Sequence, residues 1–401
     1  KELTAICHEE DPTRPTTSAM NSAQPNSPIV SGIDLIGLNY QGAGLFGRNP
    51  RYPDFHGAWP GKAVYGSETV DAYSTRGYYT FNTNESSGGR GRGGGDPNHQ
   101  VSSYDLEHAG WSYIPDVEFA AQARFPYVAG EFVWTGFDYL GEPTPYDSSR
   151  SSYSGIVDLA GFKKDRFYLY QSVWRPNYPM AHIVPQDWNW PGRVGQVTPV
   201  HIYTSGDEAE LFLNGKSLGR KKKGDYEYRL RWDDVKYEPG TLKVVAYKNG
   251  KAWATDEVRT TGPAAKLLLQ PDRGDASGFV PASSAHLAEL LIHRLLSGPA
   301  IKADGKDLYF VKVTVADEDG LMVPNAHNQI HFNIEGPGEI VATDNGDPTD
   351  FVSFPSHDRK AFNGLCLVIV RGIAGQPGTI KLTAQTEGLQ AATAVFKSAL
   401  K

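Results

Sequence analysis

The stretch KAVYGSETVDAYSTRG, residues 62–77, places a carboxylate directly after a short apolar run. Ala63-Val64-Tyr65 has the character of a buried strand, and Glu68 follows it after a glycine and a serine. A carboxylate at the carboxyl end of a parallel strand points into the mouth of a βα barrel, where barrel enzymes assemble their chemistry. The alternative is a surface acid that caps the next helix, because Ser-Glu-Thr is also typical of a strand-to-helix turn.

A second stretch, residues 125–146, places aromatic rings beside carboxylates. The apolar run Phe132-Val133-Trp134 is followed by Asp138 and then by a tail rich in turn residues. The apolar faces of a pyranose ring stack on indole and phenol rings, while its hydroxyl groups form hydrogen bonds with acids and amides. The stretch therefore indicates a carbohydrate site, with ordinary core packing as the alternative interpretation of Trp134.

Five motifs in one order resemble the second half of the catalytic barrel of glycoside hydrolase family 2, and most of all its bacterial β-galactosidases. The motifs are DPTRPTTSAMN at 11–21, GIDLIGLNY at 32–40, KAVYGSETVDAYSTRGYY at 62–79, GEFVWTGFDYLGEPTPY at 130–146 and SGIVDLAGFKKDRFYLYQSVW at 154–174. The resemblance implies a retaining glycosidase that cleaves terminal β-galactosides by double displacement, without a cofactor or a metal.

The same resemblance implies roles for five side chains. Glu68 would be the nucleophile at the end of barrel strand seven. Asn39 and Tyr40 would bind substrate from the end of strand six, and Trp134 and Asp138 would do so from the end of strand eight.

The second carboxyl group of the reaction has no counterpart at the position that the family uses. There the general acid/base glutamate follows an asparagine at the end of strand four, whereas the pair Asn84-Glu85 lies after the nucleophile in a glycine-rich loop. We therefore expect little hydrolysis by this chain alone, and a partner that is either the missing N-terminal half of the barrel or another copy of the chain. Residues 149–152, Ser-Arg-Ser-Ser, stand where family β-glucuronidases carry an Asn and Lys pair for the sugar carboxylate, which favours a neutral sugar.

Bulk composition argues against several other classes of protein. The formal charge of −7 disfavours a nucleic acid partner, because phosphate binding needs a basic surface. No stretch approaches the roughly 20 apolar residues of a membrane span. Cys7 and Cys366 lack metal-type spacing and are expected to be free, buried thiols. Asp344, Asp347 and Asp350 are expected to be solvated loop acids, with calcium binding as the alternative. A secreted or periplasmic location is favoured over a cytoplasmic one.

Length and hydrophobic pattern predict three domains. Residues 1–182 would form half of a (β/α)8 TIM-type barrel, with parallel strands at the apolar runs 16–20, 33–38, 62–65 and 127–134. Such a half-barrel leaves open strand edges that something must cover. Alternating strands then predict two immunoglobulin-like β-sandwich domains, 183–262 and 263–401, the second with an amphipathic helix at 283–296.

Two stretches are interpreted as surface. The glycine-rich residues 85–103 are expected to form a mobile rim loop. The charged run Lys163-Lys164-Asp165-Arg166 is expected to be a solvated helix start. Two other classes of function stay open, namely a non-catalytic carbohydrate-binding module and a structural or interaction fragment.

Overall fold

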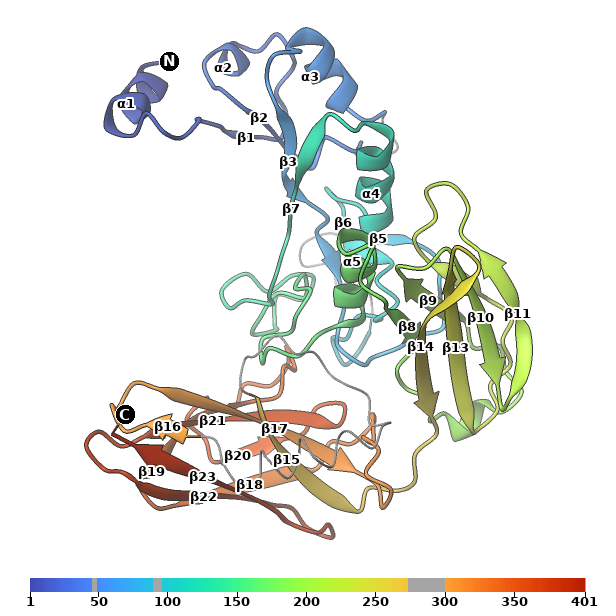
Figure 1. The fold of residues 1–401 in the computed structure, drawn as a ribbon, viewed down its shortest axis with the longest axis vertical. Helices are drawn as coiled ribbons and strands as arrows, with labels where there is room; N and C mark the ends of the chain where they lie inside the picture. The colour runs from blue at the N-terminus through green and yellow to red at the C-terminus, as the bar shows by residue number, and fades with distance from the viewer. Residues whose placement is uncertain (45–48, 89–95, 273–299, 401) are drawn as a thin grey trace. The chain divides into compact units, whose positions relative to one another are not determined.

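The computed structural model describes residues 1–44, 49–88, 96–272 and 300–400. It is mostly β with few helices (Figure 1) and divides into two compact units, Lys1–Arg259 and Thr260–Lys401. In these described ranges, no helix is long and apolar enough to cross a membrane. The helix predicted at 283–296 lies outside the described residues.

A parallel sheet of four strands organises the first part of unit one. Its order is β1-β2-β3-β7, and each adjacent pair is parallel. The strands are β1 (Ala19–Met20), β2 (Ile36–Asn39), β3 (Val64–Thr69) and β7 (Val128–Val133). All four apolar runs therefore contain a parallel strand. The third strand is longer than predicted, because Gly66 and Ser67 continue the extended chain and Glu68 belongs to the strand itself.

Helices accompany this sheet, and most of them bury one face. They are α1 (Glu2–Glu10), α2 (Pro28–Ser31), α3 (Tyr52–Ala58), α4 (Pro115–Arg124) and α5 (Asp165–Trp174). Proline stands in the first turn of α2, α3 and α4, where its missing N–H costs no hydrogen bond. Phe55 of α3 shares a core with Leu38 and Val64 of the strands. Helix α1 has no buried residue, and its Leu3 is 78% exposed.

A small three-stranded sheet, β4-β6-β5, is formed by the chain between β3 and β7. Its strands are β4 (Ala72–Tyr73), β5 (Ser86–Gly88) and β6 (Glu107–Ala109). The rim-loop prediction for 85–103 is wrong for residues 101–103, since Val101 and Ser103 are buried. Ser103 explains the difference, because its N–H and its hydroxyl donate to the carbonyls of Tyr78 and Thr75 at 2.7 Å each. Residues 89–95 lie outside the described part.

Two antiparallel sheets complete unit one and share one core. They have the orders β11-β10-β13-β14 and β12-β9-β8. The elements are β8 (Ala181–Val184), η1 (Pro191–Arg193), β9 (Val200–Thr204), β10 (Glu208–Leu213), β11 (Lys216–Lys222), β12 (Leu230–Trp232), β13 (Thr241–Lys248) and β14 (Lys251–Arg259). Asn214-Gly215, a dipeptide typical of hairpin turns, joins β10 to β11, with φ of 50° and 79° at these two residues.

Unit two also consists of two sheets around one core, with the orders β15-β17-β21-β19 and β16-β23-β22-β18-β20. Its strands are β15 (Lys266–Asp272), β16 (Ala300–Lys302), β17 (Leu308–Ala316), β18 (Gln329–Glu335), β19 (Gly338–Asp344), β20 (Asp358–Lys360), β21 (Leu365–Gly372), β22 (Gly378–Gln385) and β23 (Ala392–Ala399). All neighbours are antiparallel except β16 and β23.

Smaller predictions had mixed outcomes. Cys366 is buried as expected, but Cys7 is exposed because α1 has no covered face. The aspartates of 344–350 are not simply solvated. Asp344 is buried, and Asp350 pairs with the buried Arg359 at 3.0 Å. Among the described residues, no group of His, Cys, Asp or Glu has the arrangement of a metal site.

Arg229 fastens the antiparallel sheets of unit one to its α/β part. Its Nε donates to both carboxylate oxygens of Asp116 at 3.0 and 2.8 Å, and Nη1 donates to the carbonyl of Tyr104 at 2.6 Å. The side chain of Arg229 is only 4% exposed. The buried guanidinium thus forms an ion pair that links the chain just before β12 to helix α4.

We expect Arg229→Ala to lower the stability of unit one by roughly 3–5 kcal/mol, because it leaves a partly buried carboxylate and a buried carbonyl without their donor. Calorimetry of the chain should show the transition of unit one at a lower temperature and that of unit two unchanged. Arg220→Ala is the control, since its pair with Glu208 is partly exposed and should cost below about 1 kcal/mol. Equal shifts for both variants would contradict the fastening role.

Candidate active site

Glu68 lies at the carboxyl end of β3, between strands β2 and β7. The register of β2 against β3 pairs Asn39 with Glu68 across an irregularity in the ladder. The amide Nδ2 of Asn39 donates to Oε2 of Glu68 at 3.2 Å, and the N–H of Tyr40 donates to the carbonyl of Glu68 at 2.8 Å. The carboxyl ends of parallel strands meet at one edge of a sheet. Asn39, which is distant in sequence, can therefore donate a hydrogen bond to the Glu68 carboxylate.

Tyr40 lies beside this carboxylate in a buried position, 6% exposed. Burial raises the pKa of its phenol well above 10, and the nearby Asp71 and Glu68 carboxylates raise it further. The phenol therefore stays protonated at any physiological pH and can donate a hydrogen bond. The structure thus brings Asn39, Tyr40 and Glu68 together, as the sequence predicted for their positions at strand ends.

Trp134 joins the same edge from β7, where its N–H donates to the carbonyl of Thr69 at 2.7 Å. Its indole meets the ring of Tyr139 edge-on, with centroids 5.7 Å apart. The phenol of Tyr139 in turn donates to Oε2 of Glu142 at 2.8 Å. An aromatic wall with carboxylates beside it suits the apolar faces and the hydroxyl groups of a sugar.

Asp138 is buried, and its carboxylate is held by a lysine and a backbone N–H. It is 4% exposed, and its Oδ1 accepts from Nζ of Lys164 and from the N–H of Gly155, both at 2.8 Å. A side chain at Gly155 would not fit, since a Cβ there would lie 2.1 Å from the backbone nitrogen of Asp138. Burial raises the pKa of Asp138 to about 6 despite the attraction of Lys164. Its substrate-binding role stays a prediction.

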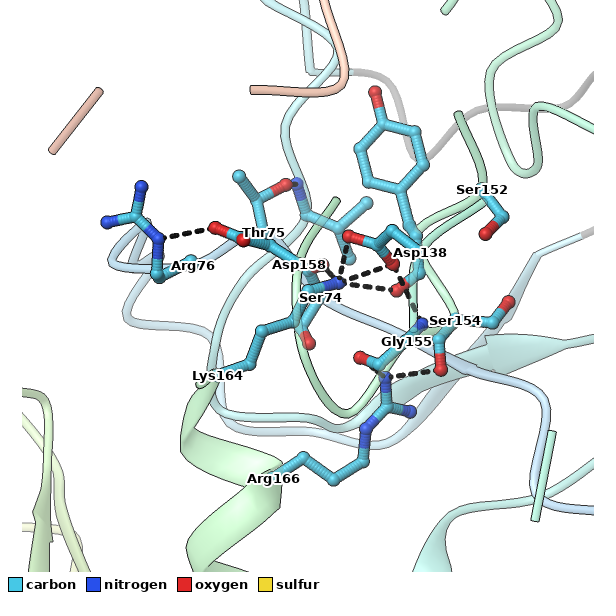
Figure 2. A network of polar contacts seen from close by, with 12 residues as sticks. Ser74, Thr75, Arg76, Asp138, Ser152, Ser154, Gly155, Asp158, Lys164 and Arg166 are labelled. Carbon is cyan, nitrogen blue, oxygen red and sulfur yellow. Dashed lines mark hydrogen bonds and ion pairs between the residues drawn. The ribbon is translucent and has the colours of Figure 1, made fainter. Parts of the chain in front are cut away.

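Figure 2 shows that the network around Asp138 continues through two cations at the start of α5. Nζ of Lys164 also donates to the carbonyls of Ser74 and Tyr153, at 2.7 and 3.0 Å. Arg166 donates to the carbonyls of Ser154 and Gly155 at 2.9 Å each, and to that of Ala72. These contacts bind the segment that follows Glu68 to the loop that precedes α5.

The prediction of a solvated charged run at 163–166 is therefore wrong for three of its four residues. Lys164, Asp165 and Arg166 are buried, and only Lys163 is exposed. The physical reason is that the carbonyls and acids that hold the two cations come from distant parts of the chain. Arg76 adds a further buried pair beside them, with its Nε 2.6 Å from Oδ2 of Asp158.

Asp71 is a site residue that sequence reasoning missed. It lies three residues after Glu68, is 4% exposed, and accepts a hydrogen bond from the hydroxyl of Ser154. Burial raises the pKa of Asp71 to about 6, with smaller contributions from the charges of Glu68 and Glu142. Proximity to Glu68 in sequence was the only signal that pointed to it, and that signal is weak. Glu142 was missed in the same way.

Two further acidic side chains, Glu118 of α4 and Glu131 of β7, lie near each other. The phenols of Tyr52 and Tyr113 donate to Glu118 at 2.6 and 2.7 Å, and the hydroxyl of Thr69 donates to Oε2 of Glu131 at 2.6 Å. Burial and the neighbouring Glu118 raise the pKa of Glu131 to about 8. The side chain of Glu131 is therefore mostly protonated in the folded protein at neutral pH.

Fold and site together define a multidomain, mostly β protein with a parallel α/β part whose strand ends carry acids and aromatic rings. Two family models match it: "Glycoside hydrolase family 2 C-terminal domain 5" at residues 297–395, and a domain of unknown function, DUF4982, at 195–254. The chain is similar over 98% of its length to "Beta-galactosidase BoGH2A" of Bacteroides ovatus, at 39% identity. A "Putative beta-glucuronidase" of Formosa agariphila is 34% identical over 59% of the chain.

A solved structure agrees with these matches. The crystal structure of a β-glycosidase from Bacteroides vulgatus superposes with a TM-score of 0.79 over 99% of this chain, at 28% identity. The chain belongs to glycoside hydrolase family 2, which confirms the resemblance seen in its motifs. It spans less than half the length of these relatives, namely 42% and 21% of the two curated proteins and 48% of the solved chain.

We expect Lys164→Met to lower the stability of unit one by roughly 3–5 kcal/mol, because it leaves the buried Asp138 carboxylate without its cation. Lys163→Met is the matched control, since that side chain is exposed and lies over the ring of Phe167, and it should cost below about 1 kcal/mol. The double variant Lys164→Met/Asp138→Asn should recover part of the loss. Chemical denaturation of the three variants measures these differences, and equal losses for the two lysines would contradict a buried ion pair.

The raised pKa of Glu131 predicts a stability that depends on pH. A carboxyl group whose pKa is raised on folding contributes fully below its unfolded pKa, near 4.5, and loses that contribution as pH rises towards about 8. Stability should therefore fall across this window by up to a few kcal/mol. In Glu131→Gln, thermal midpoints measured from pH 5 to about 9 should decline less than in wild type. The exposed Glu10→Gln should decline like wild type, and identical curves for all three proteins would contradict the assignment.

Proposed function

We propose that this chain carries the nucleophile side of a retaining glycosidase site that cleaves terminal β-galactosides. The observation that supports the proposal most is the position of Glu68, at the carboxyl edge of a parallel sheet with Asn39, Tyr40 and Trp134 around it. The curated relatives include both β-galactosidases and β-glucuronidases. The galactoside is proposed from the likeness of the motifs to bacterial β-galactosidases and from the Ser-Arg-Ser-Ser sequence at 149–152.

The proposed reaction is a double displacement at the anomeric carbon. The carboxylate of Glu68 forms a bond to C1 while the glycosidic C–O bond breaks, and the leaving oxygen takes a proton from a second carboxyl group. Water then attacks C1, gives its proton back to that second group and releases Glu68, so the configuration is retained. Asn39 and the protonated Tyr40 would hold the Glu68 carboxylate in place by hydrogen bonds.

We further propose that residues 1–182 form half of a (β/α)8 barrel, followed by immunoglobulin-like domains at 183–262 and 263–401. Strands β1 and β7 are edges of the described parallel sheet, and Phe132 on β7 is 68% exposed. Leu3 and Ile6 of α1 are exposed as well, at 78% and 54%. Such surfaces suit burial against further barrel strands and helices. The other barrel half would then supply the second carboxyl group.

The activity of the 401-residue chain tests this proposal. Alone it should hydrolyse an aryl β-galactoside little or not at all, because in this proposal the other barrel half supplies the acid that protonates the leaving group. Co-expression with the N-terminal part of a full-length relative should restore turnover. In that complex Glu68→Gln should reduce turnover by at least about a thousandfold, because no nucleophile remains.

Glu257→Gln on β14 is the matched control and should keep the activity of the complex. Turnover by the isolated chain that Glu68→Ala abolishes would show that a carboxyl group of this chain, such as Glu142, serves as the acid. An active complex that is indifferent to Glu68→Gln would refute the assigned nucleophile.

A further inference from the structure

We propose that Asp71 is a specificity-determining residue of the proposed sugar site, where it accepts a hydrogen bond from a substrate hydroxyl group and disfavours sugars that carry a carboxylate. This inference rests on the proposed function and deepens it, because it fixes the charge class of the substrate. The names of the relatives do not decide that class, since they include galactosidases and glucuronidases.

Asp71 is held by two segments of unit one, residues 109–112 and Ser154. Its N–H donates to the hydroxyl of Ser112 at 2.7 Å, and its carbonyl accepts from the N–H of Ala109 at 2.8 Å. Its Oδ1 accepts from the hydroxyl of Ser154. A side chain fixed in this way loses little conformational freedom when it binds a ligand, which is the property of a preorganised binding group.

The second carboxylate oxygen of Asp71, Oδ2, can still accept hydrogen bonds. Within the ranges that the structure describes, no hydrogen bond reaches Oδ2, and Oδ2 is not among the fully enclosed polar atoms that lack a partner. A carboxylate oxygen that is anchored through its neighbour and is not fully enclosed suits a hydroxyl donor. In this respect Asp71 differs from Asp138, whose carboxylate is held by Lys164 and Gly155.

The surroundings of Asp71 are those of the candidate site. Its charge is among the causes that raise the pKa of Tyr40, after burial, and it contributes to the raised pKa of Tyr139 after burial and Glu142. Glu68 and Glu142 in turn contribute to the raised pKa of Asp71. Three carboxylates therefore lie around the rings of Tyr40, Tyr139 and Trp134, and a ligand there experiences a negative potential.

Two buried cations of the described part of the chain, Arg166 and Lys164, have partners within the fold. Arg166, whose charge lowers the pKa of Asp71 in part, donates to the carbonyls of Ala72, Ser154 and Gly155. Lys164 pairs with Asp138, as described above. A uronic acid would thus bring a fourth carboxylate to this site, where Arg166 and Lys164 already have partners. A like charge at close range is an effective way to reject a ligand.

Binding of two uncleavable sugars to the 401-residue chain tests the inference. Ligand-observed NMR titrations would use isopropyl β-thiogalactoside and the matching β-thioglucuronide with wild type, Asp71→Asn, Trp134→Ala and Asp187→Asn. The asparagine keeps an oxygen for Ser154, removes the charge and replaces the second acceptor oxygen by an NH2 donor. Asp187 is a buried aspartate bonded to Asn189, so Asp187→Asn is the control for the loss of a buried acid. Unchanged thermal midpoints would verify that the variants fold.

We expect wild type and Asp187→Asn to prefer the neutral sugar by at least about tenfold. Asp71→Asn should weaken thiogalactoside binding and bring the two affinities within about threefold of each other, and added salt should reduce the preference in wild type more than in Asp71→Asn. Trp134→Ala should abolish both. An unchanged preference in Asp71→Asn, with both ligands lost in Trp134→Ala, would overturn the inference and leave the proposed function standing. Binding that survives Trp134→Ala, or no binding by wild type, would count against the proposed sugar site itself.

Discussion

The buried cations at the start of α5 are the constraint on which the geometry of the candidate site depends. Lys164 and Arg166 are basic side chains that are 1% and 0% exposed, so each needs partners that replace water. Lys164 finds the Asp138 carboxylate and two backbone carbonyls, while Arg166 finds three carbonyls and lies 3.7 Å from Asp105. The pKa of Asp138 is raised and that of Lys164 is lowered, which indicates that desolvation outweighs their attraction.

These buried contacts fix the position of the chain segment that follows Glu68. Ala72, Ser74 and Arg76 are alternate residues of that segment, and each is held from the region 153–166 by a cation or an acid. Asp71 is held from the same region by the hydroxyl of Ser154. The carboxyl end of β3 thus cannot shift without breaking several buried polar contacts at once. That rigidity is what a site needs to keep a nucleophile and its neighbours aligned.

Local pattern was sufficient for the strands and for part of the site. Glu208–Leu213 alternates half-buried and buried positions, and Asn214-Gly215 has the turn chemistry of a hairpin, so both were predictable. Glu68, Asn39 and Trp134 come together because each is at a parallel strand end. The sequence could not reveal the buried state of Lys164 and Arg166, because a KKDR run before a helix usually faces water. Their partners Asp138 and Ala72 lie 26 and 94 positions away, and only the tertiary fold brings them close.

Three buried aspartates show why a perturbed pKa does not by itself identify a functional group. Burial raises the pKa of Asp71, Asp105 and Asp138 to about 6 in each case. Asp138 is neutralised by a lysine at 2.8 Å, and Asp105 lies between the guanidinium groups of Arg166 and Arg229, whose charges lower its pKa. Asp71 has only a hydroxyl partner on its side chain and keeps one oxygen open. Both carboxylate oxygens of Asp105 lack a hydrogen-bond partner among the described residues but are fully enclosed, whereas an oxygen that is not enclosed and lies beside aromatic rings is equipped to bind a ligand. The partners, and not the size of the shift, therefore separate these residues by role.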